Sequence, residues 1–318
     1  MNVSVPNVTA EEINRLLQLV DSGEVLGATR QLGIIGDCLL TLARSGASDP
    51  NLRVAAKSLV RRIAETRGQS SQAVLNGTHL MAAPALDLTS HALSVSMERT
   101  VESFLESMSG WMSSIRANSA ELLLPYTTFL AYDYSSTVSF ALADLRRAGK
   151  DVVVYVPEAR SLGGGAKYLG DWEDSGITVH LIPDASLGWA LDQCDAALVG
   201  AETLSTEGGC YNTIGTKLVA NEAQRNRVPF FVMSVLLKTD LETKGDEKPI
   251  PSLDFTSTAF FEAKPMARGA MVHGNFPDLD YTPPGLITAI ITEQGSLQPA
   301  EIADAFRSFD MAGAPTRG

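Results

Sequence analysis

Several side chains that could do acid–base or phosphate chemistry follow short apolar runs in the second half of the chain. Asp133 follows the first such run and Glu202 follows the fourth. A hydroxyl, two further carboxylates and two cations stand at the ends of these runs: Ser135, Glu158, Asp184, Arg160 and Lys238. Because the carboxyl ends of parallel strands meet at one edge of a sheet, we expect these side chains to converge there. Asp184 has an alternative role as the N-cap of the helix that follows it.

A glycine-rich segment, residues 208–216, precedes a predicted helix and could bind an anion. Asn212, Thr213 and Gly215 stand at the helix start, where free N–H groups and the helix dipole favour a negative charge. The alternative is that Asn212 or Thr213 only caps the helix. A second glycine run, residues 163–165, lacks the spacing of a nucleotide-binding motif and is more typical of a flexible turn.

The elements that must position these residues change character near residue 120. Before it, apolar residues recur at helical spacing and predict helices, among them 52–66, 69–82 and 87–118. After it, apolar runs alternate with amphipathic stretches, and the runs lie at 122–131, 152–156, 177–182, 196–199 and 230–235. This alternation is typical of βα units. We therefore predict an α/β protein with an N-terminal helical domain, 1–120, and a Rossmann-like parallel-sheet domain, 121–318, that carries most of the ligand site. The polar segment 240–280 is expected to be a surface excursion.

The composition is that of a globular protein, with 318 residues of which 45% are hydrophobic and 19% charged. A formal charge of −12 argues against nucleic acid as a partner, because neutralising phosphates requires a basic face. The cysteines, Cys38, Cys194 and Cys210, and the four scattered histidines show no metal-ligand spacing, so we expect no metal and no cofactor. No apolar run approaches the roughly 18 residues of a membrane span, and residues 1–10 lack a signal-peptide pattern. These features predict a cytoplasmic protein with free thiols and no membrane partner.

Two motifs in the second half resemble the initiation factor 2B-related family. The first comprises Gly200-Ala201-Glu202 and, after it, Asn212-Thr213-Ile214-Gly215-Thr216. The second, near the C-terminus, begins Asp280-Tyr281-Thr282-Pro283-Pro284-Gly285. Their order and spacing extend the resemblance over residues 120–310. The family includes methylthioribose-1-phosphate isomerase, ribose-1,5-bisphosphate isomerase and the regulatory subunits of initiation factor 2B.

The resemblance also implies which residues contact a ligand. In the helical half, Gly27 and Ala28 stand where the family has an Arg-Gly-Ala turn, and Arg67 opens the segment where it has Arg-Pro-Thr-Ser. The full set of implied ligand and phosphate contacts is Gly27, Ala28, Arg67, Ser135, Glu158, Arg160, Asn212, Thr213, Gly215 and Lys238.

The sequence departs from the family's isomerases at their reactive pair. Those enzymes carry a cysteine after the first sheet strand and an aspartate after Gly-Ala, and Asp133 and Glu202 occupy these positions here. Thr213 replaces the lysine of their Asn-Lys-Ile-Gly-Thr motif, and Leu26 replaces the arginine of the Arg-Gly-Ala turn. The regulatory alpha subunit also lacks the cysteine and has glutamate after Gly-Ala, but it has alanine in place of Asp133.

Two functions follow from these departures. The first is an aldose–ketose isomerase for a phosphorylated pentose or a related sugar, with Asp133 and Glu202 as the catalytic pair. Two carboxylates that lie close together repel, so that one pKa rises and the pair can serve as acid and base. The alternative is a non-catalytic regulatory protein that binds a sugar phosphate or a nucleotide. We favour the enzyme, because a bare binding site gains little from two buried acids beside an anionic ligand. The family also implies a homodimer or a higher homo-oligomer.

Overall fold

The computed structural model describes residues 7–21, 27–69, 71–90, 92–161, 163–242, 250, 252–254 and 275–308. The chain divides into two compact units. The helical unit comprises Met1–Met112, Leu237–Thr239 and Asp304–Gly318, and the sheet unit comprises Ser113–Leu236 and Asp240–Ala303. The sequence put the division near residue 120, and in the structure it follows Met112, inside one long helix.

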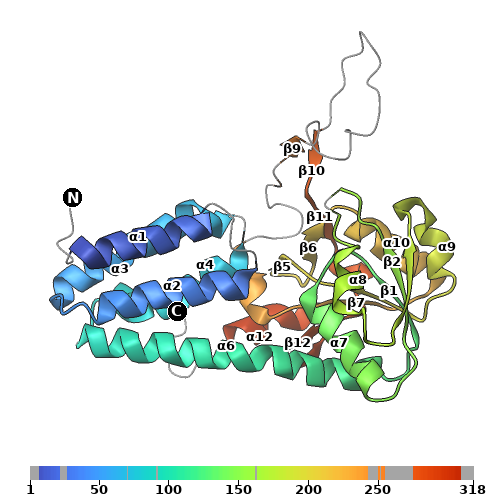
Figure 1. Cartoon of the computed structure of the whole chain (residues 1–318), viewed down its shortest axis with the longest axis horizontal. Coiled ribbons are helices and arrows are strands. Elements are labelled where there is room, and N and C mark those ends of the chain that lie inside the picture. Colours follow the sequence, from blue (N-terminus) through green and yellow to red (C-terminus); the bar gives the residue numbers. More distant parts are fainter. Residues whose placement is uncertain are drawn as a thin grey trace, which may run out of the picture. The chain divides into compact units, whose positions relative to one another are not determined.

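Amphipathic helices build the helical unit, drawn mainly in blue in Figure 1. They are α1 (Asn7–Asp21), α2 (Ala28–Ala43), α3 (Asp49–Glu65), the short 3₁₀ helix η1 (Arg67–Gln69), α4 (Gln72–Met81), α5 (Ala83–Leu86) and α6 (Leu93–Leu123). Helix α2 packs on α1 and on α4, and its side chains Ile35 and Leu39 are fully buried. No helix in the described part of the chain is long and apolar enough to cross a membrane.

Two predicted elements differ in length from the observed ones. The helix expected over 87–118 begins only at Leu93, because Asp87 instead accepts a hydrogen bond from the backbone N–H of Thr89 at 2.9 Å and closes a turn. That helix then continues to Leu123, into the segment predicted as the first strand. The strand β1 is therefore confined to Thr128–Ala131.

A seven-stranded sheet organises the second unit and confirms the predicted mostly parallel α/β fold. Its order is β13-β12-β7-β4-β1-β2-β3, and every neighbouring pair is parallel except β12 with β13. Besides β1 the strands are β2 (Val153–Pro157), β3 (Thr178–Ile182), β4 (Ala196–Val199), β7 (Phe230–Met233), β12 (Ala289–Thr292) and β13 (Gly295–Leu297). Counted along the chain, the parallel strands stand in the order 3-2-1-4-5-6 of a doubly wound sheet. Ligands of such sheets bind where the order reverses, here between β1 and β4.

Helices cover both faces of this sheet. On one face, strand residues such as Phe129 and Phe231 form a core with the end of α6, with α7 (Ser136–Arg147) and with α8 (Lys167–Asp171). On the other, α10 (Thr216–Asn226) packs on β4 and β7, with α9 (Leu187–Leu191) beside it. Strands β4 and β7 are buried throughout, as parallel strands covered on both sides must be. A last helix, α12 (Ile302–Arg307), follows the sheet.

A second, small sheet was missed by the sequence analysis. It has the order β11-β6-β5-β8 and consists of β5 (Thr203–Ser205), β6 (Cys210–Thr213), β8 (Thr239–Asp240) and β11 (Leu279–Thr282). Its strands are short and polar, and their glycine-rich connection has the composition of a loop. The antiparallel pairing of β11 with β6 places Asp280 opposite Asn212. Strands β9 (Ser252–Asp254) and β10 (Asn275–Pro277) pair antiparallel, and the rest of the predicted excursion at 240–280 lies largely outside the described residues.

A carboxylate joins the ends of two central strands. Glu293 follows β12, and both of its carboxylate oxygens accept the backbone N–H of Leu236, after β7, at 3.1 Å. Burial raises the pKa of Glu293 from its ordinary value of 4.5 to about 7, and the backbone hydrogen bonds offset only part of this effect.

Glu293 is expected to make the stability of the protein depend on pH. Its pKa is higher in the folded chain than in the unfolded one, so the folded state holds more protons between pH 4.5 and about 7. The free energy of unfolding therefore falls as the pH rises through this window, by about 3 kcal/mol at most for a shift of this size. Urea titrations at a series of pH values between 4.5 and 7 measure the free energy of unfolding. E293Q should remove the pH dependence that Glu293 causes, while E207Q, a change at an exposed acid, should retain it. Equal slopes for E293Q and the wild type would contradict the assignment.

Candidate functional site

The two predicted catalytic acids follow the strands on either side of the point where the strand order reverses. Asp133 follows β1 and Glu202 follows β4, and these strands are parallel neighbours. Burial is the main cause of a raised pKa of Asp133, and the charge of Glu202 adds a smaller effect in the same direction, so the two carboxylates lie within electrostatic reach of each other. Both acids therefore stand at the edge where a doubly wound sheet binds its ligands.

Asp133 is held in a strained and partly buried position. Its φ of 54° lies in the left-handed region, which few residues other than glycine adopt. Its Oδ2 accepts a hydrogen bond of 2.5 Å from the hydroxyl of Thr213. Burial raises the pKa of Asp133, while hydrogen bonds from Thr213 and from the backbone of Tyr134, and the charge of Lys167, lower it in part. Strain of this kind persists only where the surrounding structure enforces it, and it clusters at functional sites.

The glycine run packs directly against this acid. A Cβ at Gly164 would lie 1.7 Å from Oδ1 of Asp133, and one at Gly165 would lie 2.1 Å from the carbonyl oxygen of Pro157. Close packing therefore requires glycine at both positions, which corrects the interpretation of the run as a flexible turn. Ala159, just before the run, has a φ of 46° and is a second strained residue at this edge.

Glu202 differs from Asp133 in being exposed to solvent. Its backbone N–H donates to the carbonyl oxygen of Tyr211 at 2.9 Å, which fixes the chain while the side chain faces water. The pair thus consists of one partly buried carboxylate and one exposed one. Ser135 stands at the same edge as the N-cap of α7, where its hydroxyl accepts the N–H of Val138 at 3.4 Å.

A carboxylate of the chain itself occupies the start of α10. Oδ2 of Asp280 accepts the N–H of Gly215 at 2.8 Å, and its Oδ1 accepts the N–H of Lys217 at 3.0 Å. Burial raises the pKa of Asp280, and these two hydrogen bonds lower it in part. This arrangement corrects the expectation of free N–H groups at this helix start: a ligand anion would have to displace Asp280 or share its donors. The sequence analysis quoted Asp280 only as part of a motif and did not give it this role.

Asn212 and Thr213 face inward rather than capping this helix. Both are 5% exposed. The amide of Asn212 donates to the hydroxyl of Thr216 at 3.0 Å, and Thr213 donates to Asp133. The N-cap of α10 is Gly215, with φ 104°, where a Cβ would lie 2.1 Å from the hydroxyl oxygen of Tyr132. The segment after β1 and the segment before α10 therefore pack closely on each other and are joined by the hydrogen bond from Thr213 to Asp133.

The loop after β2 carries two more predicted contacts. Nη1 of Arg160 lies 3.9 Å from Oε1 of Glu158, and both side chains are partly exposed. The carboxylate of Asp184, after β3, accepts the backbone N–H groups of Ala159 at 2.9 Å and Arg160 at 3.0 Å. Asp184 thus fixes this loop and does not cap the helix that follows it.

The four remaining predicted contacts belong to the helical unit. Gly27 is the N-cap of α2, which begins at Ala28, and Nε of Arg67 donates to Gln31, one turn into that helix, at 3.0 Å. This unit therefore brings Arg67 close to the start of α2. Lys238 lies in the segment that the helical unit takes from the C-terminal half of the chain.

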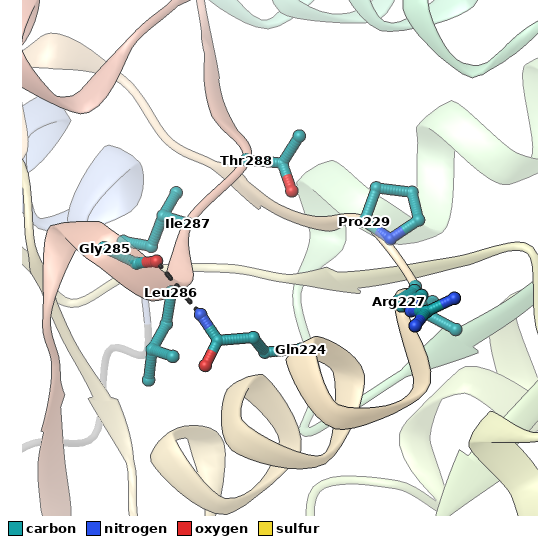
Figure 2. Close-up of a pocket in the computed structure, with 8 residues that line it drawn as sticks. Gln224, Arg227, Pro229, Gly285, Leu286, Ile287 and Thr288 are labelled. Carbon is teal, nitrogen blue, oxygen red and sulfur yellow. Dashed lines mark hydrogen bonds between the residues drawn. The ribbon is translucent and has the colours of Figure 1, made fainter.

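A hollow of about 400 Å³ opens at the opposite, amino-terminal edge of the sheet (Figure 2). Pro229 and Thr288, just before β7 and β12, line it, together with Gln224, Arg227, Val228, Gly285, Leu286 and Ile287. We place the candidate site at the carboxyl edge instead, because Asp133 and Glu202 stand there and the residues that line the hollow include no acid. Within the described residues, no cluster of three or more His, Cys, Asp or Glu side chains could hold a metal ion.

The architecture is that of an α/β protein in which a helical unit precedes a doubly wound sheet with acids at its switch point. The chain belongs to the Initiation factor 2 subunit family, whose model matches residues 36–299. The resemblance inferred from the sequence is confirmed.

The relatives of this chain include enzymes and translation factors. The methylthioribose-1-phosphate isomerase of Pelotomaculum thermopropionicum is 37% identical over 157 residues, which cover 48% of this chain and 43% of that protein. The translation initiation factor eIF2B subunit alpha of Caenorhabditis elegans is 27% identical over 202 residues, 64% of each protein. The chain thus spans between 43% and 64% of these relatives. The crystal structure of 5-methylthioribose 1-phosphate isomerase from Pyrococcus horikoshii OT3 is similar in fold, with a TM-score of 0.75 at 20% identity over 94% of this chain and 88% of that one.

Replacing Gly164 tests the packing around Asp133. G164A would force the new methyl group into the carboxylate, and overpacking of this kind typically costs about 1–3 kcal/mol. G170A is the matched control, because a Cβ at Gly170 meets nothing within 4 Å. Thermal unfolding should show a clear loss for G164A and little change for G170A. Equal stability of the two variants would contradict the packing described here.

Replacing Thr213 tests its hydrogen bond to Asp133. T213V removes the hydroxyl that donates to Asp133. The pKa of Asp133 should rise further, because this hydrogen bond stabilises the ionised carboxylate. T213S keeps a hydroxyl and should restore most of the original value. Carbon-detected NMR titration of the Asp133 carboxyl group measures both. An unchanged pKa in T213V would show that the hydrogen bond does not hold the carboxylate.

Proposed function

We propose that this protein is a sugar-phosphate isomerase in which Asp133 and Glu202 share the proton transfer. The observation that carries the proposal is the placement of one partly buried and one exposed carboxylate on the two sides of the switch point. The raised pKa of Asp133 and the charge of Glu202 beside it meet the requirement for an acid and a base in one site.

Aldose–ketose conversion moves one proton between carbons and one between oxygens. In ribose 5-phosphate, a base takes the proton from C2 of the open-chain aldose, and the electron pair forms the C1–C2 double bond of an enediol while the carbonyl oxygen takes up a proton. In a sugar 1-phosphate, the same electron pair forms the C1–C2 double bond of an enol phosphate while the ring bond from C1 to O4 breaks and O4 takes up the proton. Loss of the proton on O2 and return of a proton to C1 then yield the ketose. We assign the donation at oxygen to Asp133, because its raised pKa favours the protonated form, and the transfer at carbon to Glu202.

The substrate we propose is a phosphorylated pentose or a related sugar. The relatives named methylthioribose-1-phosphate isomerase support this class. Arg67 and Lys238, from the helical unit, and Arg160, from the sheet unit, are the cations proposed to contact phosphate. We further propose that the protein is cytoplasmic and assembles as a homodimer or a higher homo-oligomer.

A non-catalytic regulatory function is the second candidate. The similarity to an eIF2B alpha subunit, which extends over 64% of each protein, favours it, as does the engagement of Asp133 in an internal hydrogen bond. In that case both acids would only accept hydrogen bonds from the hydroxyls of a sugar phosphate or a nucleotide.

Turnover by acid variants separates the two functions. Proton transfer by a positioned side chain contributes about 10²–10⁴-fold, so D133N and E202Q should each lose that much turnover. Their ligand affinity should stay within about tenfold, because Asn and Gln keep the shape but cannot take a proton. NMR in D₂O with methylthioribose 1-phosphate, ribose 1,5-bisphosphate and ribose 5-phosphate follows both product and deuterium at C1 and C2. D192N, at an exposed acid that ends α9, is the control. Binding of these sugars by the wild type without any exchange would establish the regulatory function instead.

A further inference from the structure

The glycine run brings a cation to Asp133 that the sequence analysis did not single out. Lys167 begins α8, three residues after the glycine that packs on Oδ1 of Asp133. The N–H of Lys167 donates to the carbonyl oxygen of Gly164 at 3.1 Å. A single tight turn therefore fixes both the glycine under the acid and the backbone of the lysine.

The side chain of Lys167 lies near the loop that carries this acid. Its Nζ lies 5.8 Å from the centroid of the Tyr134 ring, and Tyr134 is the neighbour of Asp133 in the chain. Lys167 is exposed, and its charge acts on Asp133 in the sense opposite to that of Glu202. It thus stands beside the catalytic pair with its ammonium group accessible to a ligand.

The other groups at this edge that could bind an anion are already engaged. The N–H groups of Gly215 and Lys217 donate hydrogen bonds to the carboxylate of Asp280. Nη1 of Arg160 lies 3.9 Å from Oε1 of Glu158 and forms an ion pair with it. Lys167 forms no ion pair with any residue that the structure describes. Its ammonium group is near the ring of Tyr134 and is attracted by the charge of Asp133, without a direct ion pair to either oxygen of that carboxylate.

We propose that Lys167 binds the phosphate monoester of the ligand beside Asp133, in place of the start of α10. The assignment rests on the proposed function, since it names the residue that receives the anionic group at that same site. A lysine is suited to this task because its ammonium group is a compact charge with three donors on a flexible stem. The phosphate monoester could belong to a sugar phosphate or to a nucleotide.

Binding of matched probes to the full-length protein tests the assignment. The probes are ribose 5-phosphate and adenosine 5′-monophosphate, each compared with its uncharged counterpart, ribose or adenosine, by isothermal titration calorimetry. K167M should weaken the phosphorylated probe that binds by about tenfold or more, the size expected for one charge-assisted hydrogen bond, and should leave the uncharged counterpart unchanged. K167R should keep most of the affinity. K57M, on α3 of the helical unit, removes a charge elsewhere and should bind as the wild type does.

The outcomes distinguish this inference from the function on which it rests. Unchanged binding of the phosphorylated probe by K167M overturns the inference alone, and so does an equal loss for the phosphorylated and the uncharged probe. If the wild type prefers neither phosphorylated probe over its counterpart, both the inference and the proposed sugar-phosphate function fail. Preference for one of the two phosphorylated probes identifies the source of the phosphate.

Discussion

The hydrogen bond between Thr213 and Asp133 is the interaction on which the candidate site depends. It joins the loop after β1 to the segment before α10, and it holds a partly buried carboxylate whose backbone lies in the left-handed region. A buried acid without such partners would be costly. The absence of a side chain at Gly164 leaves room for it, and the chain therefore needs glycine, aspartate and threonine at three distant positions at once.

The electrostatics of the sheet edge follow from a second internal carboxylate. The carboxylate of Asp280 accepts hydrogen bonds from the N–H groups of Gly215 and Lys217 at the start of α10. Its negative charge therefore offsets the positive potential of this helix start, which would otherwise attract a ligand anion. The edge is consequently acidic, with Asp133 and Glu202 at its centre. Within the sheet unit, an anionic ligand at this edge would therefore be held by cations at its rim. This constraint is what gives Lys167 its proposed role.

The sequence predicted the fold well because its signals are local. The alternation of apolar runs with amphipathic stretches is typical of strands covered by helices, and it located the buried strands β4 and β7 as well as β2 and the edge strand β3. The small sheet was missed because its short polar strands resemble a loop. In the site, the strand ends were predictable from topology. The partners of Thr213 and Asp280 were not, since each contact joins residues more than sixty positions apart in the chain, and no periodicity encodes such a pairing.

The central claim is that two carboxylates flanking the switch point act on one small sugar. A crystal structure of the protein soaked with ribose 1,5-bisphosphate tests it most directly. The account predicts the ligand at the carboxyl edge of the sheet, with C1 and C2 and their oxygens within about 2.6–3.2 Å of both Asp133 and Glu202. A ligand that occupies the hollow beside Arg227, or one that reaches only one of the two acids, would contradict it.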